Sequence, residues 1–336
     1  MLRLASPPSP SGVQYFKVWT SHPNGVYDPG AHNILFDFQI VEYAAYAGSM
    51  VVTIEGPALH ELIQAADYSP SQALVGWHLD LYGGMSPHGL PLSTPEAGQP
   101  APGLIAAGDI LESFGNWTGT DMKISFLVVP SGLIQKPFTF FWGAGQPIAD
   151  AIANMLDLAR PDLTQKIVVN SNLIGPPHGV LHTSDSLHGM AHFLKDQTRG
   201  PNYGMAPGYP GVSLYIQNGV CVATDFSSPF NANAIKLSEE SFIGQPMWIG
   251  NDIMAMNLVM RSDIQVGDEV EMPKNFGQTP GFVTTLANLN NYAYNFKLAF
   301  TGKFIVTAMR HLGEFRGTSG EDWMTVVEAV PEVAGA

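Results

Sequence analysis

The chain has 336 residues, of which 45% are hydrophobic and only 13% charged, which excludes the low-hydrophobicity, high-charge class of disordered chains. Its 15 Lys and Arg against 29 Asp and Glu give a net charge of −14. Because no basic block offsets that charge, the sequence excludes affinity for nucleic acid through neutralised phosphates, although an acidic wall would let DNA slide past without sticking.

The first part of the chain has the pattern of a β domain. Residues 1–12 are rich in Ser and Pro and are expected to form an N-terminal arm. Residues 84–102 are rich in Pro, Gly and Ser and predict a long exposed loop. Alternating and β-branched runs predict a short helix at 58–66 and strands at 14–19, 34–41, 50–54, 73–82, 104–114 and 121–130. We therefore expect residues 13–135 to form a barrel or a sandwich.

The middle part differs, because helical periodicity appears there. The predicted elements are strands at 138–142 and 167–170 and helices at 147–160 and 184–197. Pro147 is suited to the first turn of its helix, and Ser184 is expected to be the N-cap of the second. Residues 136–200 are thus expected to form a small α+β insert.

Strand patterns return in the last part of the chain. The predicted strands lie at 212–217, 220–225, 235–237, 254–260, 269–272, 302–313 and 323–330. We expect residues 201–332 to form a second β domain, so the predicted fold class is mainly β with a small α+β part.

Four histidines gather in the middle part and raise the question of a metal site. They are His178, His182, His188 and His192. The last two are four residues apart on the predicted helix, which is a zinc-ligand spacing. Gly189 stands where a helical zinc-protease motif carries its glutamate base. The sequence favours a solvated or interface helix face, so we predict no metal and no other cofactor, and leave open whether these histidines bind a metal.

Motifs of catalysis are not found in the sequence. Cys221 is the single cysteine and is expected to be a buried strand residue. No G-x-S-x-G elbow and no phosphate-binding loop of the Walker type occurs. The acidic pairs at 239–240 and 321–322 are sequence neighbours, which point to opposite faces of a strand and cannot form a glycosidase dyad. We therefore predict no enzyme and, without an apolar stretch of about 18 residues, no membrane anchor.

Three phrases in the last part have the chemistry of turns and strands. They read SFIGQPMWI at 241–249, MRSDIQVGDEVEMP at 260–273 and GKFIVTAMRHLGEFRGTSGEDWMTVVEAV at 302–330. In the second phrase Gly267 is suited to a tight turn, and Asp263 or Asp268 to bonding the local backbone. The third phrase predicts a long hairpin whose tip is rich in Gly, Arg and Ser.

These phrases resemble the central baseplate hub proteins of contractile-tailed bacteriophages. The residues that meet the recurrent pattern of that family are Ile243, Gly244, Gln245, Pro246, Trp248, Arg261, Asp263, Ile264, Val266, Gly267, Asp268, Pro273, Gly302, Phe304, Val306, His311, Gly313, Arg316, Gly317, Trp323 and Thr325. The run WGAGQPIADAI at 142–152 also looks similar to that family. The resemblance is good over about 136–330, rests mostly on layout over 13–130, and does not include 84–102.

The resemblance implies two tail-tube-like β-barrel domains, at 13–135 and 201–332, joined by the α+β insert. It implies that three chains form a ring with pseudo-sixfold symmetry, which joins the sixfold tail tube to the threefold central spike and leaves a channel for DNA. The implied partners are the chain itself, the spike, a tail tube or tube-initiator protein and baseplate wedge proteins. The implied place is the baseplate of the virion, after assembly in the host cytoplasm.

Two other functions stay open at this point. A phage-tail hydrolase acting on the host envelope is an alternative, although no catalytic dyad or zinc motif supports it. A glycan-binding or receptor-binding β protein fits the composition but not the phrases at 241–273 and 302–330. The low charge content favours a subunit with much of its surface buried against neighbours, because interface cores are depleted in charge.

Overall fold

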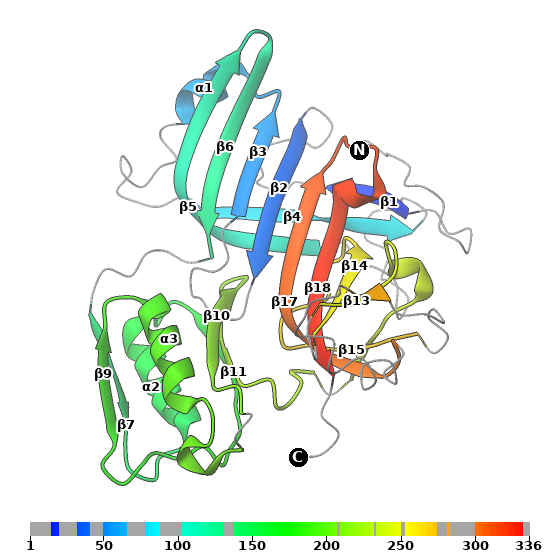
Figure 1. The fold of residues 1–336 in the computed structure, drawn as a ribbon. Helices are drawn as coiled ribbons and strands as arrows, with labels where there is room; N and C mark the ends of the chain where they lie inside the picture. The colour runs from blue at the N-terminus through cyan, green and yellow to red at the C-terminus, as the bar shows by residue number, and fades with distance from the viewer. Residues whose placement is uncertain are drawn as a thin grey trace.

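A computed structural model describes residues 15–19, 32–40, 50–65, 78–87, 103–130, 137–206, 209–231, 233–249, 253–273, 281–282 and 300–331. The fold is mainly β with few helices, as the sequence predicts. Figure 1 shows that the middle segment packs as a small unit beside a larger body, which strands from both ends of the chain build together.

The N-terminal strands alternate between buried and exposed side chains. In β3, for example, Val52 and Ile54 are buried, whereas Val51 is 48% exposed. The helix of this part lies against the β5–β6 pair, and Leu62 packs where Gly115 leaves room for it. The elements are β1 (Tyr15–Trp19), β2 (Asn33–Ile40), β3 (Met50–Glu55), α1 (Leu59–Gln64), β4 (His78–Pro87), β5 (Gly103–Thr118) and β6 (Asp121–Val129).

The middle unit places two helices between two small sheets, because each helix contacts a strand of both sheets. Its elements are β7 (Phe138–Trp142), α2 (Ile148–Ala159), β8 (Thr164–Val168), β9 (Val180–Ser184), α3 (Leu187–Thr198), β10 (Ser213–Gln217) and β11 (Val220–Thr224). One sheet pairs β7 with β9, and the other has the order β10-β11-β8. The apolar faces of both sheets and both helices form a separate core around Trp142, Ile152 and Leu194.

The C-terminal part is built on the long β17–β18 hairpin (Figure 1). Its strands are β12 (Ile235–Lys236), β13 (Met247–Trp248), β14 (Met254–Val259), β15 (Glu269–Glu271), β16 (Gly281–Phe282), β17 (Lys303–Glu314) and β18 (Trp323–Pro331). Single 3-10 turns occur at η2 (Asn202–Gly204), η3 (Glu239–Ser241) and η5 (Gly320–Asp322).

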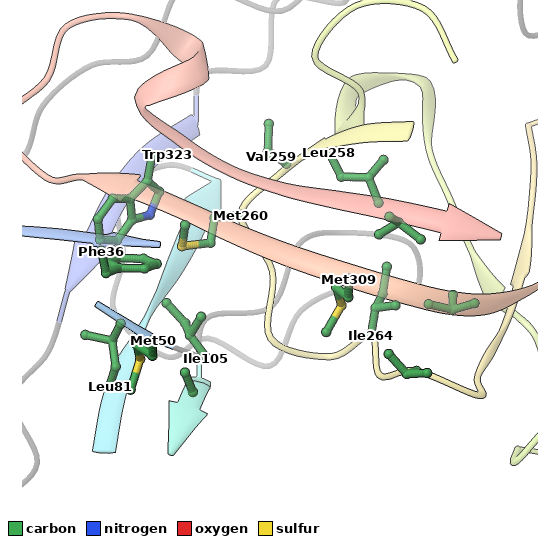
Figure 2. Packing of buried hydrophobic residues seen from close by; sticks show 14 of the residues in the cluster. Phe36, Met50, Leu81, Ile105, Leu258, Val259, Met260, Ile264, Met309 and Trp323 are labelled. Carbon is green, nitrogen blue, oxygen red and sulfur yellow. The ribbon is translucent and has the colours of Figure 1, made fainter. Parts of the chain in front are cut away.

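Strands from both ends of the chain belong to a single 13-stranded sheet. Its main path runs β1-β4-β5-β6-β3-β2-β17-β18-β14-β13-β16, so the N-terminal strands join the C-terminal strands at the β2–β17 pair. The two sets of strands also share one hydrophobic core (Figure 2). The described strands form no closed barrel, so the expectation of two barrel domains stays a prediction.

Two local predictions are corrected by the structure. Helix α3 begins at Leu187 with Ser186 as its N-cap, whereas Ser184 ends strand β9. The side-chain oxygen of Ser186 accepts a hydrogen bond from the backbone N–H of Gly189 at 3.2 Å. The hydroxyl of Ser184 instead donates to the backbone carbonyl of Ser186. Strand β4 continues to Pro87, so the start of the predicted loop 84–102 is extended strand.

Other sequence predictions concern residues that the structure does not describe or strands that join another sheet. The expected arm at 1–12 and the loop residues 88–102 lie outside the described residues. The β10–β11 hairpin pairs with β8 through parallel bonds between β11 and β8. The strands after residue 200 therefore do not all join the C-terminal sheet.

Candidate functional site

The residues of the third phrase lie where the N-terminal strands of the sheet join its C-terminal strands. We call this place the sheet seam, and it consists of strand β17 with β2 on one side and β18 on the other. Gly313 is the clearest case, because it pairs with Phe36 across one boundary and with Trp323 across the other. The seam is formed by residues about 270 positions apart in the sequence, as in the side-chain hydrogen bonds from Arg310 to Asp37.

Position 313 requires glycine because there is no space for a side chain, and not because the backbone has a conformation that favours glycine. A Cβ added there would come within 2.2 Å of the Phe36 ring, closer than any real Cβ contact. That ring stands edge-on to Trp323, with the ring centroids 5.2 Å apart, and Phe315 contacts the same indole at 5.5 Å. Figure 2 shows Phe36 and Trp323 lying together, with Met260 beside them. Such aromatic pairs contribute beyond the area they bury.

Hydrogen bonds connect the β17–β18 hairpin to strands β4 and β2 of the N-terminal part. The buried Trp323 donates its Nε1–H to the carbonyl of Gly84 in β4 at 2.8 Å. The backbone N–H of Arg316 donates to the side chain of Asn33 at 3.0 Å. Gly317 leaves room for Asp322, whose carboxylate a Cβ at that position would approach to 2.4 Å. These contacts give Arg316, Gly317 and Trp323 structural roles.

A buried polar cluster lies beneath β18. The guanidinium of Arg261 is fully buried and donates twice to Asp263, at 2.8 and 2.6 Å. Its backbone N–H donates to the hydroxyl of Thr325 at 3.2 Å, and that hydroxyl lies 2.9 Å from Nδ1 of His311. Burial lowers the pKa of His311 to about 3, because a charged imidazolium would lose its hydration in the core. The imidazole is therefore a neutral partner in the core.

The turn of the second phrase connects the C-terminal sheet to the middle unit. Gly267 has φ of +94°, and a side chain there would also strike the Phe230 ring at 2.3 Å. Asp268 is 2% exposed and accepts from the Asn231 side chain at 2.6 Å. Burial raises the pKa of this carboxyl to about 6. The carbonyl of Val266 accepts the hydroxyl of Tyr215 in β10 at 2.8 Å.

The residues of the first phrase lie at the far end of the same sheet. Gly244 is exposed with φ of +82°, and Gln245 beside it is exposed as well. Pro246 is buried, and Trp248 packs at 3% exposure against Phe300 and Phe304. Pro273, which follows β15, is half-buried. The motif residues are thus brought together in three places, around the seam, at the turn that faces the middle unit and around this edge, rather than at one point.

An open groove of about 360 Å³ lies on the outer face of the seam, and we call it the seam groove. Its lining residues are Leu35, Phe36, Asp37, Val51, Thr53, Leu312, Gly313, Glu314, Glu321 and Asp322. The sequence analysis singled out Gly313, as a residue of the family pattern, and the acidic pair Glu321 and Asp322, to which it gave no site. The remaining lining residues come from β2, β3 and β17, and no local pattern relates β2 and β3 to β17.

The four histidines do not form one cluster. His188 and His192 lie together on α3, with their Nε2 atoms 3.2 Å apart. His182, on β9, stacks on Phe193 with ring centroids 3.8 Å apart, and His178 is exposed in the preceding loop. Within the described ranges, no group of three or more His, Cys, Asp or Glu side chains is placed to hold a metal ion. The described helices are all too short or too polar to cross a bilayer.

The thiol of Cys221 is buried in β11, as its sequence surroundings predict. Burial raises the pKa of this thiol to about 12. A thiol with that pKa is protonated near neutral pH and is a poor nucleophile. Cys221 therefore serves as a small apolar residue of the middle core.

Comparisons with known proteins find similarity at the level of structure. No family model and no curated protein matches the sequence. A 43 kDa tail protein of prophage MuSo2 from Shewanella oneidensis shares 8% identity over 90% of this chain and 97% of that one, with a TM-score of 0.43. A tail protein from Neisseria meningitidis shares 9% identity over 95% and 97%, with a TM-score of 0.47.

A third solved structure is a component of the type VI secretion system of Escherichia coli, described as structurally similar to tail proteins of bacteriophage T4. It shares 10% identity over 94% of this chain and 76% of that one, with a TM-score of 0.45. All three likenesses are distant. These three solved structures are two tail proteins, one of them from a prophage, and a secretion-system component described as similar to phage T4 tail proteins.

Proposed function

We propose that this chain is a structural, non-enzymatic subunit of a phage-type tail, namely the hub of a contractile-tail baseplate. Three copies form a ring that joins the sixfold tail tube to the threefold central spike and leaves a channel for DNA. Its partners in this proposal are further copies of itself, the spike, a tail tube or tube-initiator protein and the baseplate wedge proteins. The subunit is assembled in the host cytoplasm and belongs to the virion.

The observation that carries the proposal is the structural use of the family-pattern residues, at the sheet seam and in the segment between β14 and β15. His311, Arg261 and Asp268 are buried and engaged in contacts within the fold, and Gly313 makes room for a ring. The side chains that carry the resemblance therefore hold together the sheet that both ends of the chain build. A subunit built around one extended sheet suits a part that connects tube and spike.

Large apolar side chains that are exposed in the single chain support the proposal that part of its surface is buried against neighbouring subunits. In the described part of the chain, large apolar side chains with at least 37% exposure are Val51, Leu59, Ile63, Phe114, Trp117, Phe141, Leu158, Ile174, Leu181, Met247, Ile249 and Ile253. Phe141 and Leu181 are direct cross-strand partners on the outer face of the β7–β9 sheet, at 60% and 70% exposure. Phe141 and Leu181 therefore form an adjacent exposed apolar pair, which association with another subunit would cover.

The finer architecture belongs to the same proposal. In this proposal the tube-like barrel domains are residues 13–135 and the chain that follows the middle unit, which extends through β11 (Val220–Thr224) rather than ending at residue 200. In a ring, strand edges of one subunit pair with those of the next, because unpaired edges are templates for another chain. The net charge of −14 gives such a channel an acidic wall, along which a polyanion passes without being held.

The oligomeric state of the full chain tests the proposal. We expect mass photometry to detect a trimer when the chain is mixed with its spike protein. A variant with Phe141→Ser and Leu181→Ser, compared with Thr139→Ser and Thr183→Ser on the same sheet face, measures whether that apolar pair contributes to association. A species that stays monomeric with the spike present, at micromolar concentration, would refute the ring. A gel shift of duplex DNA at physiological salt would refute the acidic channel.

A further inference from the structure

Two histidines on the exposed side of α3 converge and share a hydrogen bond, at a place to which the proposed function gives no role. His188 and His192 are both exposed, and their Nε2 atoms lie 3.2 Å apart. Their rings meet edge to face, at an interplanar angle of 83°. The opposite side of α3 is buried in the middle core through Met190, Ala191 and Leu194. The pair is thus displayed to solvent on a helix whose own position is fixed.

The spacing of the two nitrogens matches the bite of a tetrahedral metal ion. With Zn–N bonds of about 2.0–2.1 Å, two nitrogens 3.2 Å apart subtend roughly 100° at the ion, close to the tetrahedral angle. Imidazole nitrogen is a preferred ligand of Zn²⁺, Ni²⁺ and Cu²⁺, whereas Mg²⁺ and Ca²⁺ prefer oxygen. The net charge of −14 adds a general attraction for cations.

The start of the helix fixes the position of the first histidine. Ser186 caps α3 by accepting the amide of Gly189, so His188 lies in the first turn and His192 one turn later. Residues four apart on a helix face the same side. His182 does not join the pair in the structure, since its ring is stacked on Phe193.

We propose that His188 and His192 form a two-ligand site for one borderline divalent transition-metal ion, held through both Nε2 atoms. No group of three or more potential ligands occurs within the described ranges, so the ion keeps further positions for water or for a ligand from another chain. When either histidine is replaced, the ion is held by one imidazole nitrogen instead of two. The expected cost is on the order of 10²-fold in affinity, the range in which joined contacts exceed single ones.

Isothermal titration of the full chain, without an affinity tag, with Zn²⁺ and separately with Ni²⁺ tests the site. We expect one ion per chain, with His188→Gln and His192→Gln each weakening binding on the order of 10²-fold. His178→Gln is the matched control, because that histidine is exposed and outside the pair. It is expected to leave binding unchanged.

A rescue variant separates chelation from any general effect on the helix. Asp196 is exposed and four residues beyond His192, so His188→Gln combined with Asp196→His restores a pair at the same spacing. We expect this double variant to recover binding that His188→Gln alone loses. Stoichiometric binding that survives His192→Gln, no binding by the parent chain, or failure of the rescue with an unchanged circular dichroism spectrum would each overturn the proposal.

Discussion

Replacing Gly313 with Ala perturbs the sheet seam at a single methyl group. The added Cβ would lie 2.2 Å from the Phe36 ring, whereas ordinary van der Waals contacts begin at 3.4 Å, so the ring or the strand has to move by about 1 Å. The Phe36 ring is 5% exposed and held edge-on by Trp323, which leaves it little room to retreat. Overpacking of this kind costs roughly 1–3 kcal/mol of unfolding free energy.

The steric cause predicts a specific rescue. Shortening the neighbour with Phe36→Leu removes the atoms that collide, so the two substitutions together are expected to cost about 1–2 kcal/mol less than the sum of the single costs. Gly244→Ala is the matched control. Gly244 has φ of +82° and no heavy atom within 4 Å of an added Cβ, so its cost of about 1–2 kcal/mol comes from backbone strain alone.

Urea unfolding, followed by tryptophan fluorescence at one fixed protein concentration, measures these free energies, because association shifts apparent stability. Phe36→Leu is expected to couple with Gly313→Ala and to be additive with Gly244→Ala within about 0.5 kcal/mol. If Gly313→Ala is neutral, or if its cost is unchanged in the Phe36→Leu background, the steric account of this glycine is wrong.

Two buried titratable groups give opposite pH dependences of stability. Burial holds the pKa of His311 near 3, below its usual 6.5. Its contribution to the free energy of unfolding is therefore present above pH 6.5 and is lost as pH falls toward 3. We expect His311→Gln to flatten the acid side of the curve of stability against pH, measured by urea unfolding from pH 4 to 7. Burial raises the pKa of Asp268 from 3.8 to about 6, so the folded state holds this proton longer than the unfolded chain, and its contribution is present below pH 3.8 and lost as pH rises through about 6. Asp268→Asn is expected to steepen the rise of stability with pH over that interval, and an unchanged slope would contradict the raised pKa.

Local patterns in the sequence were sufficient for most strands and both long helices. Alternation predicts β2, because side chains on a half-buried strand must change face at every residue, and β-branched residues predict β3. The turn at 116–119 predicts the hairpin of β5 and β6. Helical periodicity and Pro147 predict α2 for a similar reason, since its buried residues recur every three or four positions. The start of α3 was predicted two residues early, because Ser184 and Ser186 are equally good caps by residue type.

Strand partners were decided only in the tertiary structure. Alternation states which face of a strand is buried, but it does not state which strand lies beside it. The pairing of β2 with β17 and the parallel pairing of β11 with β8 have no local signal. The seam groove follows from the first pairing, and the sequence therefore did not relate Gly313, Glu321 and Asp322 to its lining residues on β2 and β3.

The amino-acid sequence by itself determined that this protein is a β-rich, acidic chain with a helical middle part, because burial periodicity, turn residues and charge are local properties. It also placed His188 and His192 one helical turn apart. The tertiary structure decided that both ends of the chain build one sheet and that the motif residues meet in three places along it. The physical reason is that packing chooses among compatible sheet edges and faces, and that choice depends on side chains far apart in the chain, such as Phe36 and Gly313.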